Sequence, residues 1–313
     1  MNSPLISILI STYNWPCFKL AGQLERLVAK ETVNIEIIVG EDASTDHQII
    51  LENKKITTLP HCKYIYFTEN NGRAKIRNKL SNIAQGQYLL FIDSDALVIS
   101  PNFLSEYIKY LPNHDVIYGG ISTPRHSFDE KNRTLRLTYE NAAKKIRTLS
   151  FRRKNPYKYI SAFNILIKHE LFDKVKFNEK CISYGYEDAL LGIELKIRGK
   201  EIYHIDNPLL HTGIDTNKEY IEKVKKSLAT LYTIGKPMQD ESSICKIHNI
   251  LEKNRLKAPI EFLFNHCLKK LLEKNLLSRH PALILLNLYK ICYYCILCKQ
   301  SERKDSNKTI TEV

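Results

Sequence analysis

Two carboxylates one residue apart, Asp93 and Asp95, end an apolar run that begins at Tyr88. An uninterrupted apolar run of this length predicts a strand buried on both faces, as in a parallel sheet covered by helices. Ligands of such sheets bind beyond the carboxyl ends of the strands, where this pair would lie. Carboxylate oxygens, together with the phosphate oxygens of a ligand, suit a hard divalent cation. The pair alone also fits a solvated loop, so its interpretation depends on the rest of the chain.

Other polar residues follow earlier predicted strands. Thr12, Tyr13 and Asn14 come after the first apolar run, and Asp42 after the second. A carboxylate can accept a hydrogen bond from the N–H of a nucleotide base, and a tyrosine ring can pack against that base. Arg77, on the helix before the acidic pair, offers forked donors to carbonyl or phosphate oxygens. The alternative is structural, with Tyr13 covering the sheet and Arg77 pairing Asp42. We favour the functional interpretation because these residues fall at successive strand or helix ends.

The elements that must position these residues alternate along the first half of the chain. Strand-like runs are separated by segments with helix-like spacing of apolar residues, which predicts βαβ units and a largely parallel sheet. The expected strands are Leu5–Ile10, Ile35–Val39, Lys63–Phe67 and Tyr88–Asp93, and the expected helices are Cys17–Lys30 and Arg73–Ala84. The fold class is therefore α/β, with a mostly parallel sheet between helices.

The second half is less regular. A helix is expected at 101–110, and strands are expected at 115–119, 160–167 and 201–205. Residues 123–157 are polar and basic, which favours a mobile loop or a helical insertion. Glu187 and Asp188 begin an amphipathic helix, and the chain reads as helical from Thr216 almost to Lys299. We predict a catalytic domain at 1–215, a helical C-terminal extension at 216–300 and a disordered tail at 301–313.

Taken in order, these polar residues closely resemble the inverting family 2 glycosyltransferases, which have the glycosyltransferase A fold. The resemblance extends from about Leu5 to Gly213. One departure is Glu41-Asp42-Ala43-Ser44, where the family usually has Asp-Asp-Gly-Ser. The motifs that carry the resemblance are Tyr13-Asn14, Asp42 and Asp46, Arg77, Asp93-x-Asp95, Glu187-Asp188 and His211.

The resemblance implies a role for each motif. It implies an enzyme of the hexosyl- or N-acetylhexosaminyltransferase class, with Asp188 as the base that accepts the proton of the acceptor hydroxyl. It implies that Asp95 and His211 bind Mn²⁺ or Mg²⁺, although a lone histidine is as often structural. The residues implied in acceptor binding are Glu187, Tyr184 and Tyr186. Those implied in donor binding are Thr12, Tyr13, Asn14, Asp42, Arg77, Asp93 and Ser94.

The expected partners are a nucleoside-diphosphate sugar, with a UDP-sugar favoured by Asp42, and a glycan or lipid-linked acceptor in polysaccharide or glycoconjugate biosynthesis. Two alternatives remain open. One is a nucleotidyltransferase, which lacks support because no Gly-rich, basic signature loop follows the first strand. The other is a non-catalytic protein that binds glycan or nucleic acid through basic patches. We expect no nucleic-acid partner.

Charge and apolar content are uneven along the 313 residues. The net charge is +13, and from Lys246 onward thirteen Lys and Arg face six Asp and Glu. The apolar run 281–298 contains Asn287 and Lys290, which favours a helix on a membrane surface over a spanning one. A helical lid or a dimer contact is the alternative. From the scattered cysteines and the lack of a leader-like pattern at the N-terminus we expect a cytoplasmic protein, with peripheral contact to the inner face of the membrane expected by analogy.

Overall fold

We describe the chain from a computed structural model, in which residues 5–124 and 131–311 are described, with side chains as far as Lys299. The chain forms two compact units, and each is made of several chain segments. The first contains Met1–Arg125, Ala143–Ile182 and Glu187–Gly213. The second contains His126–Ala142, Ser183–Tyr186 and Ile214–Val313. Two segments of the second unit, 126–142 and 183–186, therefore lie within the range predicted for the catalytic domain. No sequence pattern indicates a change of unit at either segment.

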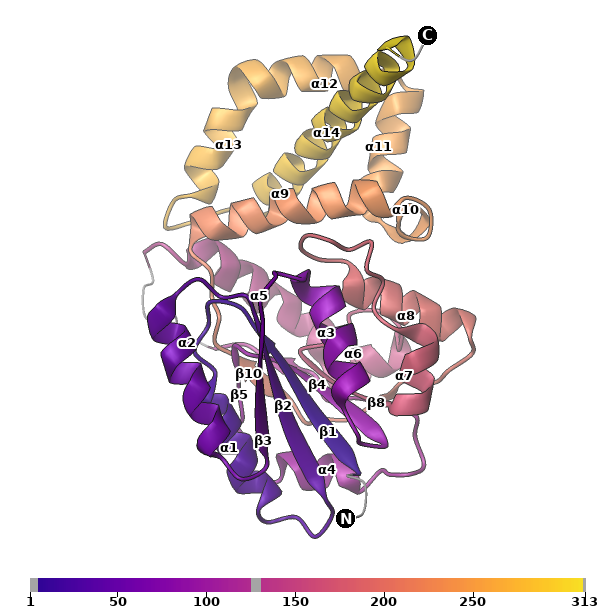
Figure 1. Cartoon of the computed structure of the whole chain (residues 1–313). Helices are drawn as coiled ribbons and strands as arrows, with labels where there is room; N and C mark the ends of the chain where they lie inside the picture. Colours follow the sequence, from indigo (N-terminus) through magenta and orange to yellow (C-terminus); the bar gives the residue numbers. More distant parts are fainter. Residues whose placement is uncertain (1–4, 125–130, 312–313) are drawn as a thin grey trace. The chain divides into compact units, whose positions relative to one another are not determined.

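A seven-stranded sheet forms the centre of the first unit, in the order β3-β2-β1-β4-β8-β6-β9 (Figure 1). β1 pairs in parallel with β2 and β4, and β2 with β3, whereas β8 runs antiparallel to both β4 and β6. The predicted α/β class with a mostly parallel sheet is confirmed. The strands are β1 (Ile6–Thr12), β2 (Ile35–Asp42), β3 (Cys62–Phe67), β4 (Tyr88–Asp93), β6 (Val116–Tyr118), β8 (Asn164–Lys168) and β9 (Tyr203–His204).

β1, β2 and β4 appear where the sequence predicts them because their apolar runs are buried, whereas β3, also near its predicted place, is partly exposed along its whole length. In β1, every residue from Ile6 to Ile10 is buried, and in β4 every residue from Tyr88 to Ile92. The expected strand at 160–167 is only partly confirmed, since β8 begins at Asn164. Three short strands that the sequence did not reveal form a second sheet in the order β5-β10-β7. They are β5 (Ala96–Leu97), β7 (Ile121–Ser122) and β10 (Leu209–His211).

Helices cover both faces of the large sheet. Leu20 and Leu24 of α1 and Phe103 of α4 join the core on the face of Ile8, whereas Leu80 of α3 lies against Gly40 on the other face. Residues 123–157, expected as a loop or a helical insertion, contain two helices in their described part. The helices are α1 (Phe18–Val28), α2 (His47–Lys54), α3 (Gly72–Ile83), α4 (Phe103–Ile108), α5 (Thr134–Arg147), α6 (Leu149–Lys154), α7 (His169–Val175) and α8 (Glu187–Ile197).

The second unit is helical beyond Thr216, as the sequence predicts. A capping box between Thr216 and Glu219 begins its first long helix. α14 continues to Thr311, through residues for which disorder was expected, because a formed helix extends at little cost through Glu, Arg and Lys. No helix in the described residues is both long and apolar enough to cross a bilayer. The helices are α9 (Asn217–Ile234), α10 (Met238–Glu241), α11 (Ser243–Lys253), α12 (Lys257–Leu263), the π-helix η2 (Phe264–Leu268), α13 (Lys269–Leu276) and α14 (Leu283–Thr311).

Candidate active site

The small sheet brings His211 to the acidic pair. β10 runs antiparallel to β5 and pairs His211 with Ala96, the residue after Asp95. The Nε2 atom of His211 lies 3.2 Å from Oδ2 of Asp95. The backbone N–H and the hydroxyl of Thr212 both donate to the carbonyl oxygen of Asp95, at 2.9 and 2.7 Å. A Cβ atom at Gly213 would collide with the Asp95 carboxylate, so only glycine fits there.

This pair suits part of the coordination sphere of a divalent cation. Adjacent ligands of an octahedral ion at roughly 2.1 Å lie about 3 Å apart, which agrees with the spacing of the Asp95 oxygen and the His211 nitrogen. One carboxylate oxygen and one imidazole nitrogen fit Mn²⁺ at least as well as Mg²⁺. Among the described residues no group of three or more His, Cys, Asp or Glu could hold a metal. Other ligands would therefore have to come from the diphosphate of a donor and from water.

Arg77 of α3 connects the end of β4 to the start of α8. Its Nη2 donates to Oδ1 of Asp93 at 2.6 Å and its Nη1 to Oε1 of Glu187 at 3.2 Å. The guanidinium also lies over the ring of Phe177, 5.3 Å from its centre, and only 4% of the side chain is exposed. Burial by itself would lower the pKa of Arg77, but neighbouring carboxylates, with Asp93 first, raise it overall. The alternative pairing of Arg77 with Asp42 is therefore wrong.

Asp188, in the first turn of α8, has two defined donors. Its Oδ2 accepts from the Ser161 hydroxyl at 2.7 Å and its Oδ1 from the backbone N–H of Ala162 at 3.0 Å. Burial and, next, the adjacent Glu187 raise the pKa of Asp188, whereas Arg77 and the Ser161 hydrogen bond lower it, and the net result is a pKa of about 6. A carboxylate with such a pKa is suited to accept a proton near neutral pH. Glu187 itself is buried against Arg77, and its expected role in acceptor binding stays a prediction.

Four of the expected donor-binding residues, Thr12, Tyr13, Asn14 and Asp42, lie at the ends of β1 and β2. Asn14 adopts a left-handed backbone, φ 48°, and its side-chain oxygen accepts from the backbone N–H groups of Thr45 and Asp46. These bonds join the loop after β1 to the loop after β2. Thr12 is buried, and half of the neighbouring Tyr13 side chain is exposed, as stacking on a base would require.

Asp42 is more occupied than the sequence suggests. Its carboxylate accepts from the backbone N–H and the amide of Asn71, at 2.8 and 2.9 Å, and from the backbone N–H of Gly72 at 2.9 Å. These bonds hold the N-terminus of α3 beside β2. Because a carboxylate has about four acceptor positions, roughly one remains for a base N–H. Contact of Asp42 or of Ser94, which lies in the turn after β4, with a donor stays a prediction.

Glu41 and Ala43 show how the loop after β2 accommodates its departure from the family pattern. Glu41 is completely buried and accepts hydrogen bonds from Ser44, Asn53 and Tyr64. The bond from the Asn53 amide nitrogen to the Glu41 carboxylate measures 2.8 Å. Ala43 takes the left-handed conformation, φ 56°, that a glycine would adopt without strain. Sequence reasoning left the role of Glu41 open, and its contacts assign it to holding this loop in place.

Tyr184 and Tyr186 belong to the second unit. The Tyr184 ring lies 5.5 Å from Nζ of Lys223, and Tyr186 takes a positive φ of 72° directly after Gly185, φ 88°. Burial raises the pKa of Tyr186 well above its ordinary range. The two rings directly precede Glu187 and Asp188 in the chain, and their contact with an acceptor stays a prediction.

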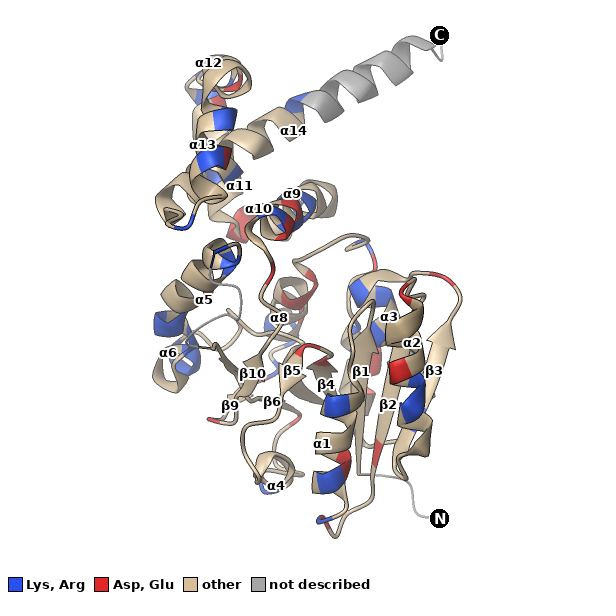
Figure 2. Ribbon diagram, turned by 90° about the vertical axis from the view of Figure 1, so that its left-hand side faces the viewer, with Lys and Arg blue, Asp and Glu red and all other residues tan. Residues whose placement is uncertain are grey.

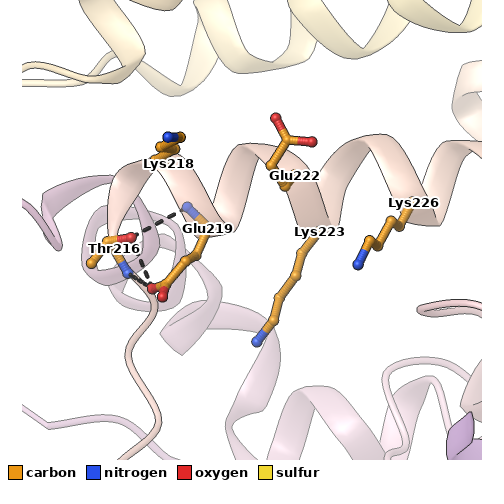
Figure 3. Close-up of a pocket in the computed structure, with 6 residues that line it drawn as sticks. All are labelled: Thr216, Lys218, Glu219, Glu222, Lys223 and Lys226. Atoms are coloured by element: carbon orange, nitrogen blue, oxygen red, sulfur yellow. Dashed lines mark hydrogen bonds between the residues drawn. The ribbon is translucent and has the colours of Figure 1, made fainter. Parts of the chain in front are cut away.

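A pocket of about 470 Å³ lies along α9 in the second unit (Figure 3). None of the site residues expected from the sequence lines it. The capping-box hydrogen bonds of Thr216 with Glu219 lie at one end, and three lysines and two glutamates line the pocket. Its residues are Thr216, Lys218, Glu219, Glu222, Lys223 and Lys226.

Comparison with known proteins places these features in context. The sequence pattern of "Glycosyl transferase family 2" matches residues 7–176, which contain most of the large sheet, except β9, and the acidic pair. An uncharacterized glycosyltransferase of Haemophilus influenzae is 31% identical over 188 residues, which cover 59% of this chain and 71% of that protein. A putative colanic acid biosynthesis glycosyl transferase of Escherichia coli is 29% identical over 120 residues, 37% of this chain and 42% of that protein.

Among solved structures, the fold is similar to that of a mannosyltransferase from Pyrobaculum calidifontis, determined in complex with GDP-Man and Mn²⁺. The TM-score is 0.51 and the sequence identity 16%, and the match covers 75% of this chain and 65% of that one. Identity this low supports a common fold only. The chain thus spans slightly less than two thirds of the archaeal protein.

Proposed function

The chain belongs to glycosyl transferase family 2 and is a glycosyltransferase; from that premise we propose that it moves a sugar, with inversion, from a nucleoside-diphosphate donor to a hydroxyl of a glycan or lipid-linked acceptor. The proposed pathway is polysaccharide or glycoconjugate biosynthesis. The similarity to a putative colanic acid transferase supports this assignment.

The observation that carries the proposal is a continuous polar network within the first unit. Asp93, two residues from the proposed metal ligand Asp95, shares Arg77 with Glu187, and Glu187 precedes the proposed base. Donor and acceptor chemistry would therefore take place at the two ends of one ion-paired group. Such fixed charges need little reorganisation during a reaction.

The proposed reaction is a direct displacement. The acceptor oxygen attacks the anomeric carbon, the bond from that carbon to the diphosphate breaks, and an oxygen of Asp188 accepts the hydroxyl proton. Ser161 and the Ala162 N–H hold the carboxylate in one orientation. A divalent ion held by Asp95 and His211 would neutralise charge on the departing nucleoside diphosphate.

We propose uridine as the nucleoside of the donor, on the resemblance around Asp42. Guanosine is the first alternative to uridine, because the mannosyltransferase from Pyrobaculum calidifontis was determined in complex with GDP-Man. We propose measuring the thermal unfolding of the purified chain with UDP, GDP, CDP and dTDP, each with Mn²⁺ and with chelator. The expected result is a raised midpoint with UDP and Mn²⁺ that chelator removes, because a ligand that binds only the folded state stabilises it.

Two variants test whether the shift comes from this site. Asp95→Ala is expected to abolish the metal-dependent shift, whereas Asp173→Ala, which removes an exposed carboxylate from α7, is the matched control. No shift with any diphosphate, in folded protein, would contradict the proposed donor class. A shift retained in Asp95→Ala would contradict the proposed metal ligand.

A further inference from the structure

The continuous helical segment 257–276, formed by α12, η2 and α13, has two distinct faces. Its inner face carries the buried side chains Phe264, Leu272 and Leu276, spaced at eight and four residues. The Phe264 ring meets that of Tyr289, on α14, at a centre-to-centre distance of 5.5 Å. The inner face is therefore part of the core of the second unit.

The carboxylates of this segment turn toward the same inner side. Only Glu261 and Glu273 are acidic between residues 257 and 276. Glu261 is buried and pairs with Lys299 of α14. Glu273 accepts a hydrogen bond from the Tyr289 hydroxyl at 3.0 Å. Negative charge is thereby removed from the outer face.

The outer face exposes large apolar side chains and lysines together. Phe262 is 65% exposed, Leu271 64% and Leu263 47%, and Figure 2 shows basic residues along α13. The three lysines of this face are Lys269, Lys270 and Lys274. They are exposed and make no ion pair with any residue of the described chain. We define the outer surface as Phe262, Leu263, Lys269, Lys270, Leu271 and Lys274.

We propose that this outer surface binds the face of a membrane that contains anionic lipid. Exposed aromatic and aliphatic side chains gain from entering the boundary between headgroups and acyl chains. Lysines beside them can extend along apolar surface and keep their ammonium groups at headgroup level, where anionic lipid attracts them. A surface that binds nucleic acid would need the lysines but not the three exposed apolar side chains, so we favour a membrane over nucleic acid. The inference is independent of the transferase reaction and does not require the donor site.

Vesicle binding by the full chain tests the proposal. We expect the protein to co-sediment with vesicles of phosphatidylcholine and phosphatidylglycerol, and much less with phosphatidylcholine alone. Replacement of Lys270 by Gln is expected to lower the partition coefficient about fivefold, since each basic residue near such a surface contributes on the order of 1 kcal/mol. The double variant Phe262→Ser and Leu271→Ser is expected to lower it at least about tenfold.

Leu51 provides the matched control. It lies on α2 in the first unit, and its side chain is 65% exposed, like that of Phe262. Leu51→Ser removes a similar exposed apolar group and is expected to leave vesicle binding unchanged. Thermal unfolding of each variant checks that a loss of binding is not a loss of folding.

Cys267 allows a direct readout of insertion. It is exposed and lies within the same helical segment, whereas the other cysteines of the described residues are buried or partly buried. A polarity-sensitive dye on Cys267 is expected to shift to shorter wavelength when anionic vesicles are added. The same dye on Leu51→Cys, in a Cys267→Ser background, is expected not to shift.

Three outcomes would overturn the proposal. One is an absence of binding to anionic vesicles. Another is binding that the double variant leaves intact. The third is a self-associating wild type that the double variant renders monomeric, with no vesicle binding, which would assign the surface to contact between two copies of the chain. None of these outcomes depends on nucleotide, so each is distinguishable from failure of the proposed transferase function.

Discussion

Asp188 is the residue whose surroundings most directly constrain the chemistry. Burial and Glu187 raise the pKa of its carboxyl, whereas the Ser161 hydroxyl lowers it. Arg77 limits the repulsion between Glu187 and Asp188, because it binds the first and lies near the second. These opposing effects lead to two predictions at the scale of single residues.

The first prediction concerns pH. A base must be unprotonated, so kcat/KM is expected to rise with pH through about 6 and then to level off. Ser161→Ala removes a hydrogen bond that favours the carboxylate, so the inflection should move to higher pH. The measurement is a pH profile of both proteins, with Ser105→Ala on α4 as control. An inflection that stays in place would mean that Ser161 does not orient the titrating group.

The second prediction concerns Asp188 itself. Asp188→Asn keeps the shape of the side chain but removes its basicity, so kcat is expected to fall by roughly 10²–10⁴. Stabilisation of the folded protein by donor diphosphate and Mn²⁺ should be retained. Single-turnover rates and thermal unfolding together separate the two effects, and an unchanged kcat would show that another group accepts the proton.

At the scale of elements, two short strands and one loop decide the geometry of the site. β5 and β10 are too short to show a pattern in the sequence, yet their pairing brings His211 to Asp95. The loop after β2 is held through Glu41 and strained at Ala43. Each feature leads to a prediction that a single methyl group tests.

Gly213→Ala places a methyl group against the Asp95 carboxylate and is expected to abolish the Mn²⁺-dependent nucleotide shift. Gly22→Ala on α1 is the matched control, because its new methyl group would meet only the end of the Arg26 side chain, at 3.8 Å. The readout is thermal unfolding with and without ligand. A normal metal-dependent shift in Gly213→Ala would show that the carboxylate does not need its present position.

Ala43→Gly is expected to stabilise the protein by roughly 1 kcal/mol, because glycine adopts a positive φ without the strain that alanine incurs. Ala29→Gly, at a right-handed helical position with φ −62°, should have the opposite sign. Urea unfolding measures both changes in free energy. A loss of stability in Ala43→Gly would indicate that the methyl group makes a contact worth more than the strain.

At the scale of the whole molecule, donor chemistry and the proposed membrane surface belong to different compact units. We expect Asp95→Ala to abolish the nucleotide shift and leave vesicle binding intact, and the double variant Phe262→Ser and Leu271→Ser to do the reverse. The combined variant should show both losses without further interaction, as sites that share no partners usually do. Thermal unfolding and co-sedimentation on the three proteins measure this, and a variant that impairs both functions would contradict their independence.

The class of fold and most of the residues that deserve testing follow from local patterns in the sequence. Apolar runs and polar strand ends are local properties, so β1 to β4, Asp93, Asp95 and the start of α8 could be located without any structure. The family resemblance supplied the roles. It also singled out His211, which no local pattern distinguishes from a structural histidine.

Which of these residues contact one another depends on how the elements pack, and no sequence pattern showed it. Arg77 binds Asp93 and Glu187, which lie sixteen and one hundred and ten residues away in the chain, and not Asp42. Asp42 instead holds the start of α3, and residues 183–186 pack with the second unit. Contacts between distant segments depend on the packing of whole elements, whereas sequence patterns report periodicity within one element. For the same reason the inward carboxylates of residues 257–276 and the outward lysines at 269, 270 and 274 became visible only when α14 was in place beside them.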